Sequence, residues 1–178
     1  GQLGDGTVID RPIPVQVESG ITFSSAGDFH SLYVDSKGSL WAMGYNDRGQ
    51  LGIGNEEDQI EPVRVVETGI DRVEGGGFHT LFLTEDGSLW GVGGNGLGQL
   101  GDGSQISRSH PVPVQTGVLD MAAGGFHSLF IKADRTLWAM GGNWSGQLGN
   151  GQITDFFGGP NSDPIQVETT GPVRTVSA

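Results

Sequence analysis

Cysteine is absent from all 178 residues, so disulfides, nucleophilic thiols and thiolate metal ligands are excluded. Basic residues are scarce as well: 9 Lys and Arg stand against 21 Asp and Glu, and the net charge is −12. A protein that binds duplex nucleic acid needs a basic face to release counterions, so we expect no nucleic-acid partner. The charge favours a well-solvated surface, with a docking surface for a basic partner as the alternative.

Long apolar runs are missing too, and no stretch reaches the length of a membrane span. Helical periodicity is not seen anywhere in the sequence. The first residues, GQLGDGT, have none of the features of a signal peptide and begin within a repeated motif. The lack of cysteine leaves the compartment open.

What the sequence does contain is one segment repeated at a constant step. GQLG begins at residues 1, 49, 98 and 146, which are 48, 49 and 48 residues apart. Phe-His pairs begin at 29, 78 and 126, and Leu-Trp pairs at 40, 89 and 137. Three motifs in one register indicate a repeat architecture. The length suggests a single repeat domain over residues 1–178, which we divide at 1–20 (partial), 21–69, 70–117, 118–171 and 172–178 (partial).

Each repeat contains four short segments of β-type sequence, separated by turn signals. We expect the first strands at Ile21–Ala26, Ile70–Gly75, Val118–Ala123 and Pro172–Ala178. The second strands are expected at His30–Asp35, His79–Thr84 and His127–Lys132. The third strands are expected at Ser39–Gly44, Ser88–Gly93 and Thr136–Gly141. The fourth strands are expected at Pro14–Val17, Pro62–Val66, Pro111–Gln115 and Pro164–Val167.

Proline cannot donate to an interior ladder, so the fourth strand of each repeat should be an outer edge. Four strands per repeat without helices are typical of a propeller blade and not of the helical solenoids of similar period. The sequence therefore predicts an all-β chain, a β-propeller of four-stranded antiparallel blades with about three and a half blades present. Such a chain is either part of a longer propeller or half of an assembled ring, and its open blade faces would favour self-association.

The repeats resemble those of the regulator of chromosome condensation family, whose members form seven-bladed β-propellers. The resemblance is carried by Gly76-Gly77-Phe78-His79-Thr80, by Leu89-Trp90-Gly91-Val92-Gly93, and by the segment from Asn95 to Gly101, with Pro111 and Val114 after it. It covers essentially the whole chain. It is specific for the fold and much less so for the activity.

The histidines that recur in each repeat suggest a metal or catalytic site at first sight. His30, His79 and His127 have no second His or carboxylate at ligand spacing, so we interpret them as packing residues between blades, as the family resemblance also implies. We expect the three repeated tryptophans, Trp41, Trp90 and Trp138, to lie in the core. We predict no catalytic residue, no metal and no cofactor.

Three further motifs have a local explanation. Asp5-Gly6 and Asp102-Gly103 are similar to calcium loops, but other repeats lack the aspartate, which favours turn chemistry. Asn143-Trp144-Ser145 matches the N-glycosylation pattern, a short motif that is common by chance. The glycines of GQLG lack the helix and the Lys-Ser/Thr step of a phosphate-binding loop.

Function is expected where the repeats differ. From GQLG to the proline of the fourth strand the offset is 13 residues in three copies and 18 in the last, because of an insertion within residues 154–161 that contains Phe156 and Phe157. Aromatic side chains on inserted loops are common interface anchors. We therefore predict partner-binding residues at Phe156 and Phe157, at Trp144, which replaces smaller residues before GQLG and is expected to be exposed, and at Glu56 and Glu57 of an acidic loop.

The sequence favours a non-enzymatic scaffold that binds another protein. Two alternatives stay open: guanine-nucleotide exchange on a small GTPase, which the family resemblance implies, and carbohydrate binding or hydrolysis by a secreted or cell-surface propeller. The carbohydrate alternative rests on Asp28, which replaces a glycine before the first Phe-His pair. The partner is not identified by the sequence. The near-identical repeats and the acidic balance favour a secreted or surface protein of a bacterium.

Overall fold

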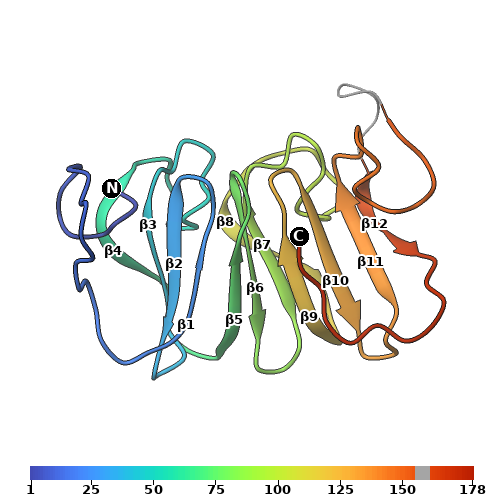
Figure 1. Ribbon diagram of the computed structural model, residues 1–178, viewed down its shortest axis with the longest axis horizontal. Helices are drawn as coiled ribbons and strands as arrows, with labels where there is room; N and C mark the ends of the chain where they lie inside the picture. The colour runs from blue at the N-terminus through green and yellow to red at the C-terminus, as the bar shows by residue number, and fades with distance from the viewer. Residues whose placement is uncertain (155–160) are drawn as a thin grey trace.

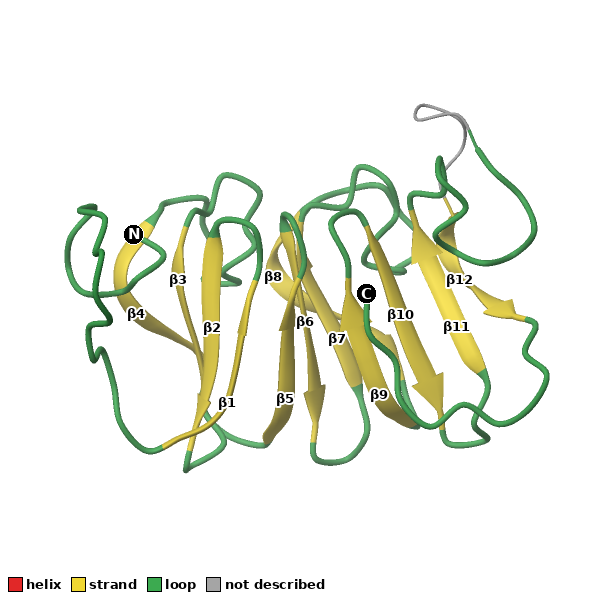
Figure 2. Ribbon diagram, in the orientation of Figure 1, coloured by secondary structure: helices red, strands yellow, loops and turns green. Residues whose placement is uncertain are grey.

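Twelve strands make up the regular structure of the computed structural model, which describes residues 1–154 and 161–178 (Figure 1). All regular structure there is strand, and no helix of membrane-spanning length and hydropathy occurs in these ranges (Figure 2). The strands are β1 Ile21–Ala26, β2 His30–Asp35, β3 Leu40–Gly44, β4 Gln59–Val66, β5 Ile70–Gly75, β6 His79–Thr84, β7 Leu89–Gly93, β8 Arg108–Gln115, β9 Val118–Ala123, β10 His127–Lys132, β11 Leu137–Gly141 and β12 Asn161–Val167.

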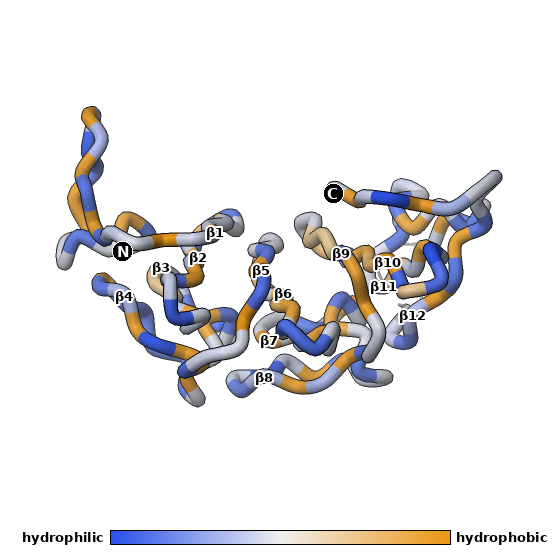
Figure 3. The backbone as a smooth tube through the Cα atoms, turned by 90° about the horizontal axis from the view of Figure 1, so that it is seen from below, coloured by the Kyte–Doolittle hydropathy of each residue, from blue (hydrophilic) through white to orange (hydrophobic). Residues whose placement is uncertain are grey.

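The strands form three four-stranded antiparallel sheets in sequential order, β1 to β4, β5 to β8 and β9 to β12. Seen along the strands, the sheets stand side by side like the blades of a fan, with β1, β5 and β9 on the inner side and β4, β8 and β12 on the outer side (Figure 3). This is the arrangement of propeller blades. The predicted fold class and the outer position of the fourth strand are confirmed.

Corresponding residues of the second and third strands pair identically in each blade. His30 lies opposite Gly44, His79 opposite Gly93 and His127 opposite Gly141. Aromatic pairs also stack across the central strands: Tyr33 on Trp41, Phe82 on Trp90 and Phe130 on Trp138, with ring centroids 6.0–6.3 Å apart. All three tryptophans are half-buried, and Trp90 and Trp138 pack against the core between blades.

The hydrophobic core lies between adjacent blades. One cluster joins Leu32, Val34 and Leu40 of the first blade to Val73 and Phe82 of the second. A second cluster lies between the second blade and the third. It includes the side chains of Leu81, Leu83, Leu89, Met121, Phe130 and Met140. Because each blade buries one face against the next, neighbouring repeats stabilise each other.

The fourth strands begin three residues earlier than predicted, at Gln59, Arg108 and Asn161. The prolines Pro62 and Pro111 fall where the register with the third strand shifts. A shift of register leaves a backbone position without a ladder partner, so a residue that lacks an N–H fits there. The strand can therefore extend beyond its proline.

Two segments predicted as strands, 14–17 and 172–178, form none. No strand of the described chain lies in position to pair with either one. Instead, the backbone N–H of Val173 donates to the Arg135 carbonyl and that of Val176 to the Asp120 carboxylate. The last residues therefore run back along the third blade (Figure 1).

The segment before the first blade also carries exposed apolar side chains. Leu3, Ile13 and Val15 are 43%, 72% and 47% exposed and line a groove of about 340 Å³. Self-association through an open blade face stays a prediction.

Candidate functional site

Five aromatic side chains form a continuous row across the three blades. We call Phe29, Tyr45, Phe78, Phe126 and Trp144 the aromatic row. Each phenylalanine immediately precedes the second strand of its blade, whereas Tyr45 immediately follows the third strand of the first blade. These positions lie at one end of the blades, the upper end in Figure 1, where the longer loops also lie.

The rings of the aromatic row touch one another in sequence. Ring centroids are 5.7 Å apart between Phe29 and Phe78, 6.2 Å between Phe78 and Phe126, and 5.6 Å between Phe126 and Trp144. Tyr45 meets Phe29 at 6.0 Å and Phe78 at 6.3 Å, in both cases edge to face. Such pairs are favourable beyond their buried area, so the row is a pre-ordered surface.

The backbone explains why these phenylalanines are aligned. The Phe29 carbonyl accepts a hydrogen bond from the Tyr45 N–H at 2.9 Å, and the Phe78 carbonyl accepts one from the Gly94 N–H at 2.7 Å. Gly93 adopts a φ of 105°, and a Cβ there would lie 2.7 Å from the Phe78 carbonyl oxygen. Only glycine permits this close approach of the two segments.

Solvent reaches the aromatic row. Phe29 is 47% exposed and the other four members are half-buried. Two grooves run beside them, one of about 420 Å³ lined by Phe29, Tyr45 and Phe78, and one of about 520 Å³ lined by Tyr45, Phe78 and Phe126. Aromatic side chains are normally buried in a core or in an interface, so an exposed aromatic surface of this extent is unusual.

Carboxylates stand at the edge of the two grooves. Asp58 lines the smaller groove and Asp47 the larger one. Asp47 also accepts a hydrogen bond from the Tyr45 hydroxyl, and this bond raises the pKa of the phenol. Arg48 is the cation among the described lining residues. Its contact with Asp47 is a loose 3.9 Å, and their side chains are 60% and 46% exposed.

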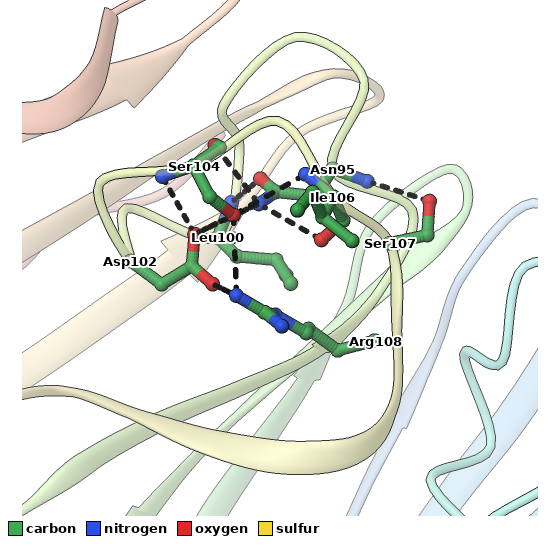
Figure 4. A network of polar contacts seen from close by, with 7 residues as sticks. All are labelled: Asn95, Leu100, Asp102, Ser104, Ile106, Ser107 and Arg108. Carbon is green, nitrogen blue, oxygen red and sulfur yellow. Dashed lines mark hydrogen bonds and ion pairs between the residues drawn. The ribbon is translucent and has the colours of Figure 1, made fainter.

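A buried asparagine holds the loop beneath the row in each blade, three residues before each GQLG. The Asn95 Oδ1 accepts from the Leu100 N–H at 3.0 Å, and its Nδ2 donates to the Asp102 carboxylate and the Ser104 carbonyl at 2.9 and 3.0 Å (Figure 4). Asn46 and Asn143 make the equivalent bond to the leucine of their own GQLG. The loops are therefore rigid supports.

The repeated histidines connect adjacent blades. His30 Nε2 lies 2.9 Å from the Thr80 hydroxyl, and that hydroxyl donates to the Gln50 carbonyl. His79 Nε2 lies 2.8 Å from the Ser128 hydroxyl, which donates to a GQLG carbonyl in the same way. Because each hydroxyl uses its proton on a carbonyl, the ring must donate from Nε2–H.

These histidines are neutral. Burial lowers the pKa of His30 to about 4 and that of His79 to about 3. Within residues 1–154 and 161–178, no group of three or more His, Asp or Glu side chains is arranged to hold a metal. The interpretation of the histidines as packing residues between blades agrees with this geometry.

Two other motifs are explained by local hydrogen bonds. The Asp102 carboxylate accepts from the Ser104 backbone and hydroxyl and from Arg108 Nε, and Asp5 is bound in the same way by Thr7 and Arg11. These are turn contacts, as predicted. Asn143 is 1% exposed, and its Nδ2 donates to the Asn150 side chain, so the folded chain cannot present it for glycosylation.

The predicted site residues separate into three groups. Trp144 belongs to the aromatic row, although it is half-buried against Phe126 rather than exposed. Glu56 and Glu57 are exposed in the loop that leads to Asp58. Phe156 and Phe157 lie outside the described residues.

The sequence analysis did not select Phe29, Phe78 and Phe126, because it expected function where the repeats differ and these residues recur. Strand alternation was the available signal: the histidine of each Phe-His pair is directed between the blades, so the preceding residue lies on the other side. Recurrence identifies a repeated position and does not show that the position is buried.

Comparison with known proteins gives consistent results. The regulator of chromosome condensation (RCC1) repeat matches residues 37–83 and 86–131, and a second description of this repeat matches 70–99 and 118–147. The ultraviolet-B receptor UVR8 of Arabidopsis thaliana is 42% identical over 69 residues, 36% of this chain and 16% of the receptor. The RCC2 homolog of Xenopus laevis is 39% identical over 64 residues, 34% of this chain and 12% of that protein.

Solved structures show the same fold. Human WBSCR16 superposes with a TM-score of 0.73 at 25% identity, over 89% of this chain and 43% of that one. Yeast RCC1 (Prp20), in a structure with Kap60 bound, gives 0.73 at 23% identity, over 93% and 41%. This chain thus spans less than half the length of each of these relatives. The matched repeats cover more than half of its residues, and the chain belongs to the regulator of chromosome condensation (RCC1) repeat family.

Proposed function

We propose that this segment is a non-enzymatic scaffold that binds another protein through the aromatic row. The observation that carries the proposal is the continuity of the row: rings from three blades form one partly exposed surface beside two grooves. Aromatic side chains dominate binding energy at interfaces because they desolvate a large area at little entropic cost. The buried Asn and His contacts hold this surface rigid, and rigidity lowers the entropic cost of binding.

The relatives support a role in protein binding. Kap60 is bound to yeast RCC1 (Prp20), and another structure of Prp20p is described with its binding properties to Gsp1p and histones. Their identity to this chain is below 25%, so these partners are not transferred to it. They are consistent with a propeller that binds proteins by its surface loops.

Removing the central ring of the row should weaken partner binding. Phe78 contacts Phe29, Tyr45 and Phe126, so Phe78→Ala interrupts the row at its middle. When a displayed library of random peptides is selected on the wild-type protein, we expect a set of peptides to be enriched. These peptides should bind Phe78→Ala at least about tenfold more weakly than they bind the wild type. Circular dichroism and thermal unfolding report whether the variant is folded.

Leu119→Ala is the matched control. Leu119 is an exposed apolar residue on β9, 39% exposed, near the end of the blade opposite the row. The control should bind every enriched peptide as the wild type does. Equal binding by Phe78→Ala and the wild type, or no enrichment at all, would contradict the proposed function.

Carbohydrate binding is the alternative that exposed rings favour. Guanine-nucleotide exchange is an alternative that only the family resemblance implies. Binding to a glycan array that depends on Phe78 would favour the carbohydrate alternative. Accelerated nucleotide release from a panel of GTPases would favour the exchange alternative.

A further inference from the structure

The surroundings of the aromatic row are acidic. Asp47 and Asp58 line its grooves, and Glu56 and Glu57 are exposed in the same loop as Asp58. Arg48 carries a positive charge next to these four carboxylates, and its guanidinium already lies beside Asp47. With a net charge of −12 on the whole chain, the field at this surface attracts cations.

We propose that the partner segment is basic and extended: an arginine- or lysine-rich stretch of polypeptide that lies along the aromatic row. This inference rests on the proposed function and names the chemistry of the partner. A cation placed over an aromatic ring is attracted by the negative ring face, and arginine makes this contact most often. Nearby carboxylates hold the same cation through charge-assisted hydrogen bonds.

The spacing of the rings fits an extended chain. In a β-strand successive side chains alternate sides, and the rise is about 3.3 Å per residue, so side chains on one side are about 6.6 Å apart. The centroids of Phe29, Phe78 and Phe126 are separated by 5.7 and 6.2 Å. Every second residue of a bound segment therefore meets one ring of the row, and a segment with arginine at alternate positions matches best.

An apolar partner explains less of the surface. It would cover the rings but leave Asp47 and Asp58 beside the grooves to be desolvated without a counter-charge, which is unfavourable. A basic segment satisfies the rings and the carboxylates together. Complementary charge also accelerates encounter and makes it sensitive to salt.

The test uses a fluorescein-labelled peptide of alternating arginine and glycine, with fluorescence anisotropy as the readout. Its citrulline counterpart has the same shape without the charge. We expect the arginine peptide to bind and the citrulline peptide to bind at least about tenfold more weakly. A peptide of equal composition with the arginines in one block should also bind more weakly, because only alternate residues meet the rings.

Two variants assign the interaction to the row. Phe78→Leu keeps apolar bulk but removes the ring, and Asp47→Asn combined with Asp58→Asn removes two charges at constant shape. Both should weaken binding of the arginine peptide several-fold, and about 1 M salt should abolish it, because screening then acts within about 3 Å. Glu85→Gln, at an exposed carboxylate on the opposite end of the blades, should change nothing.

Each other outcome overturns the inference. Equal affinity for arginine and citrulline peptides would show that charge is not recognised. An equal effect of Glu85→Gln would show attraction by net charge alone. If the arginine peptide does not bind but random peptides are still enriched through Phe78, the basic partner is wrong and the proposed function stands. If neither binds, both are wrong.

Discussion

Replacing Asn95 with alanine is expected to destabilise the chain by about 3 kcal/mol, because two or more buried polar groups lose their partners at once. Asn95 is 0% exposed. Its Oδ1 satisfies the buried Leu100 N–H, and its Nδ2 satisfies the carbonyls of Ser104 and Ile106 at 3.0 and 3.3 Å. Alanine supplies none of these contacts, and the compact loop leaves no obvious route for water to replace them.

Urea unfolding followed by tryptophan fluorescence measures this loss. The matched control is Gln105→Ala, an exposed residue of the same loop, which should change the free energy of unfolding by no more than about 0.5 kcal/mol. Asn95→Asp should also destabilise, because a second carboxylate would replace the amide that now donates to Asp102 at 2.9 Å. Equal stability of Asn95→Ala and Gln105→Ala would refute the role of this asparagine as the support of the loop.

Acidification should destabilise the chain below pH 6.5. The folded-state pKa values of His30 and His79 are about 4 and about 3, against 6.5 for an unperturbed histidine. Between these values the unfolded state binds more protons than the folded state, so stability falls as the pH falls. Each histidine contributes a slope that approaches about 1.4 kcal/mol per pH unit well below pH 6.5, and together they remove about 4 kcal/mol between pH 6.5 and 4.5.

Burial also lowers the pKa of His127, so His127 acts in the same direction in this window, whereas Asp35 acts below it and Glu74 against it. Backbone and side-chain hydrogen bonds, first those from Ser39 and Trp41, lower the pKa of Asp35 to about 2, so its stabilising contribution is lost only below the usual range of a carboxyl group. Burial raises the pKa of Glu74, so Glu74 favours the folded state as the pH falls. The histidine effect should dominate from pH 6.5 to 4.5.

His79→Gln separates the histidine effect from the rest. The glutamine Nε2 can still donate to the Ser128 hydroxyl, but it does not titrate. We expect the free energy of unfolding of this variant to depend clearly less on pH than that of the wild type, with the remainder due to His30 and His127. Gln105→Ala, at an exposed residue that does not titrate, should leave that dependence unchanged. An unaltered slope in His79→Gln would mean that the buried histidine does not control acid stability.

Much of the fold could be predicted because the sequence pattern of one blade is repeated several times. Each copy of GQLG, Phe-His and Leu-Trp constrains the same blade, so an ambiguity in one repeat is resolved by the others. The strand limits were less certain at the prolines: Pro62 seemed to begin a strand because it lacks an N–H, but the register shift beside β3 accommodates it. The segments at 14–17 and 172–178 carry the right pattern but have no neighbouring strand.

The candidate site was harder to predict, for a reason that the aromatic row makes clear. The repeated phenylalanine was not selected, because function was expected where the repeats differ. In the structure, repetition itself builds the surface, because Phe29, Phe78 and Phe126 meet only when their blades stand side by side. The sequence does show that an asparagine such as Asn95 stands at a constant position before GQLG. The hydrogen bonds that it makes could not be predicted, because they depend on how the loop folds back.

The central claim, that partners bind at the row end of the blades, is tested most directly by site-specific photo-crosslinking. A benzoylphenylalanine is placed at Leu97, which lines the larger groove, or at Glu85, which is exposed in the hairpin at the other end. With the arginine–glycine peptide and with the peptides selected from the random library, we predict crosslinks from position 97 and none from position 85. Equal crosslinking from the two positions, or crosslinking from position 85 alone, would contradict the assignment of the aromatic row as the binding surface.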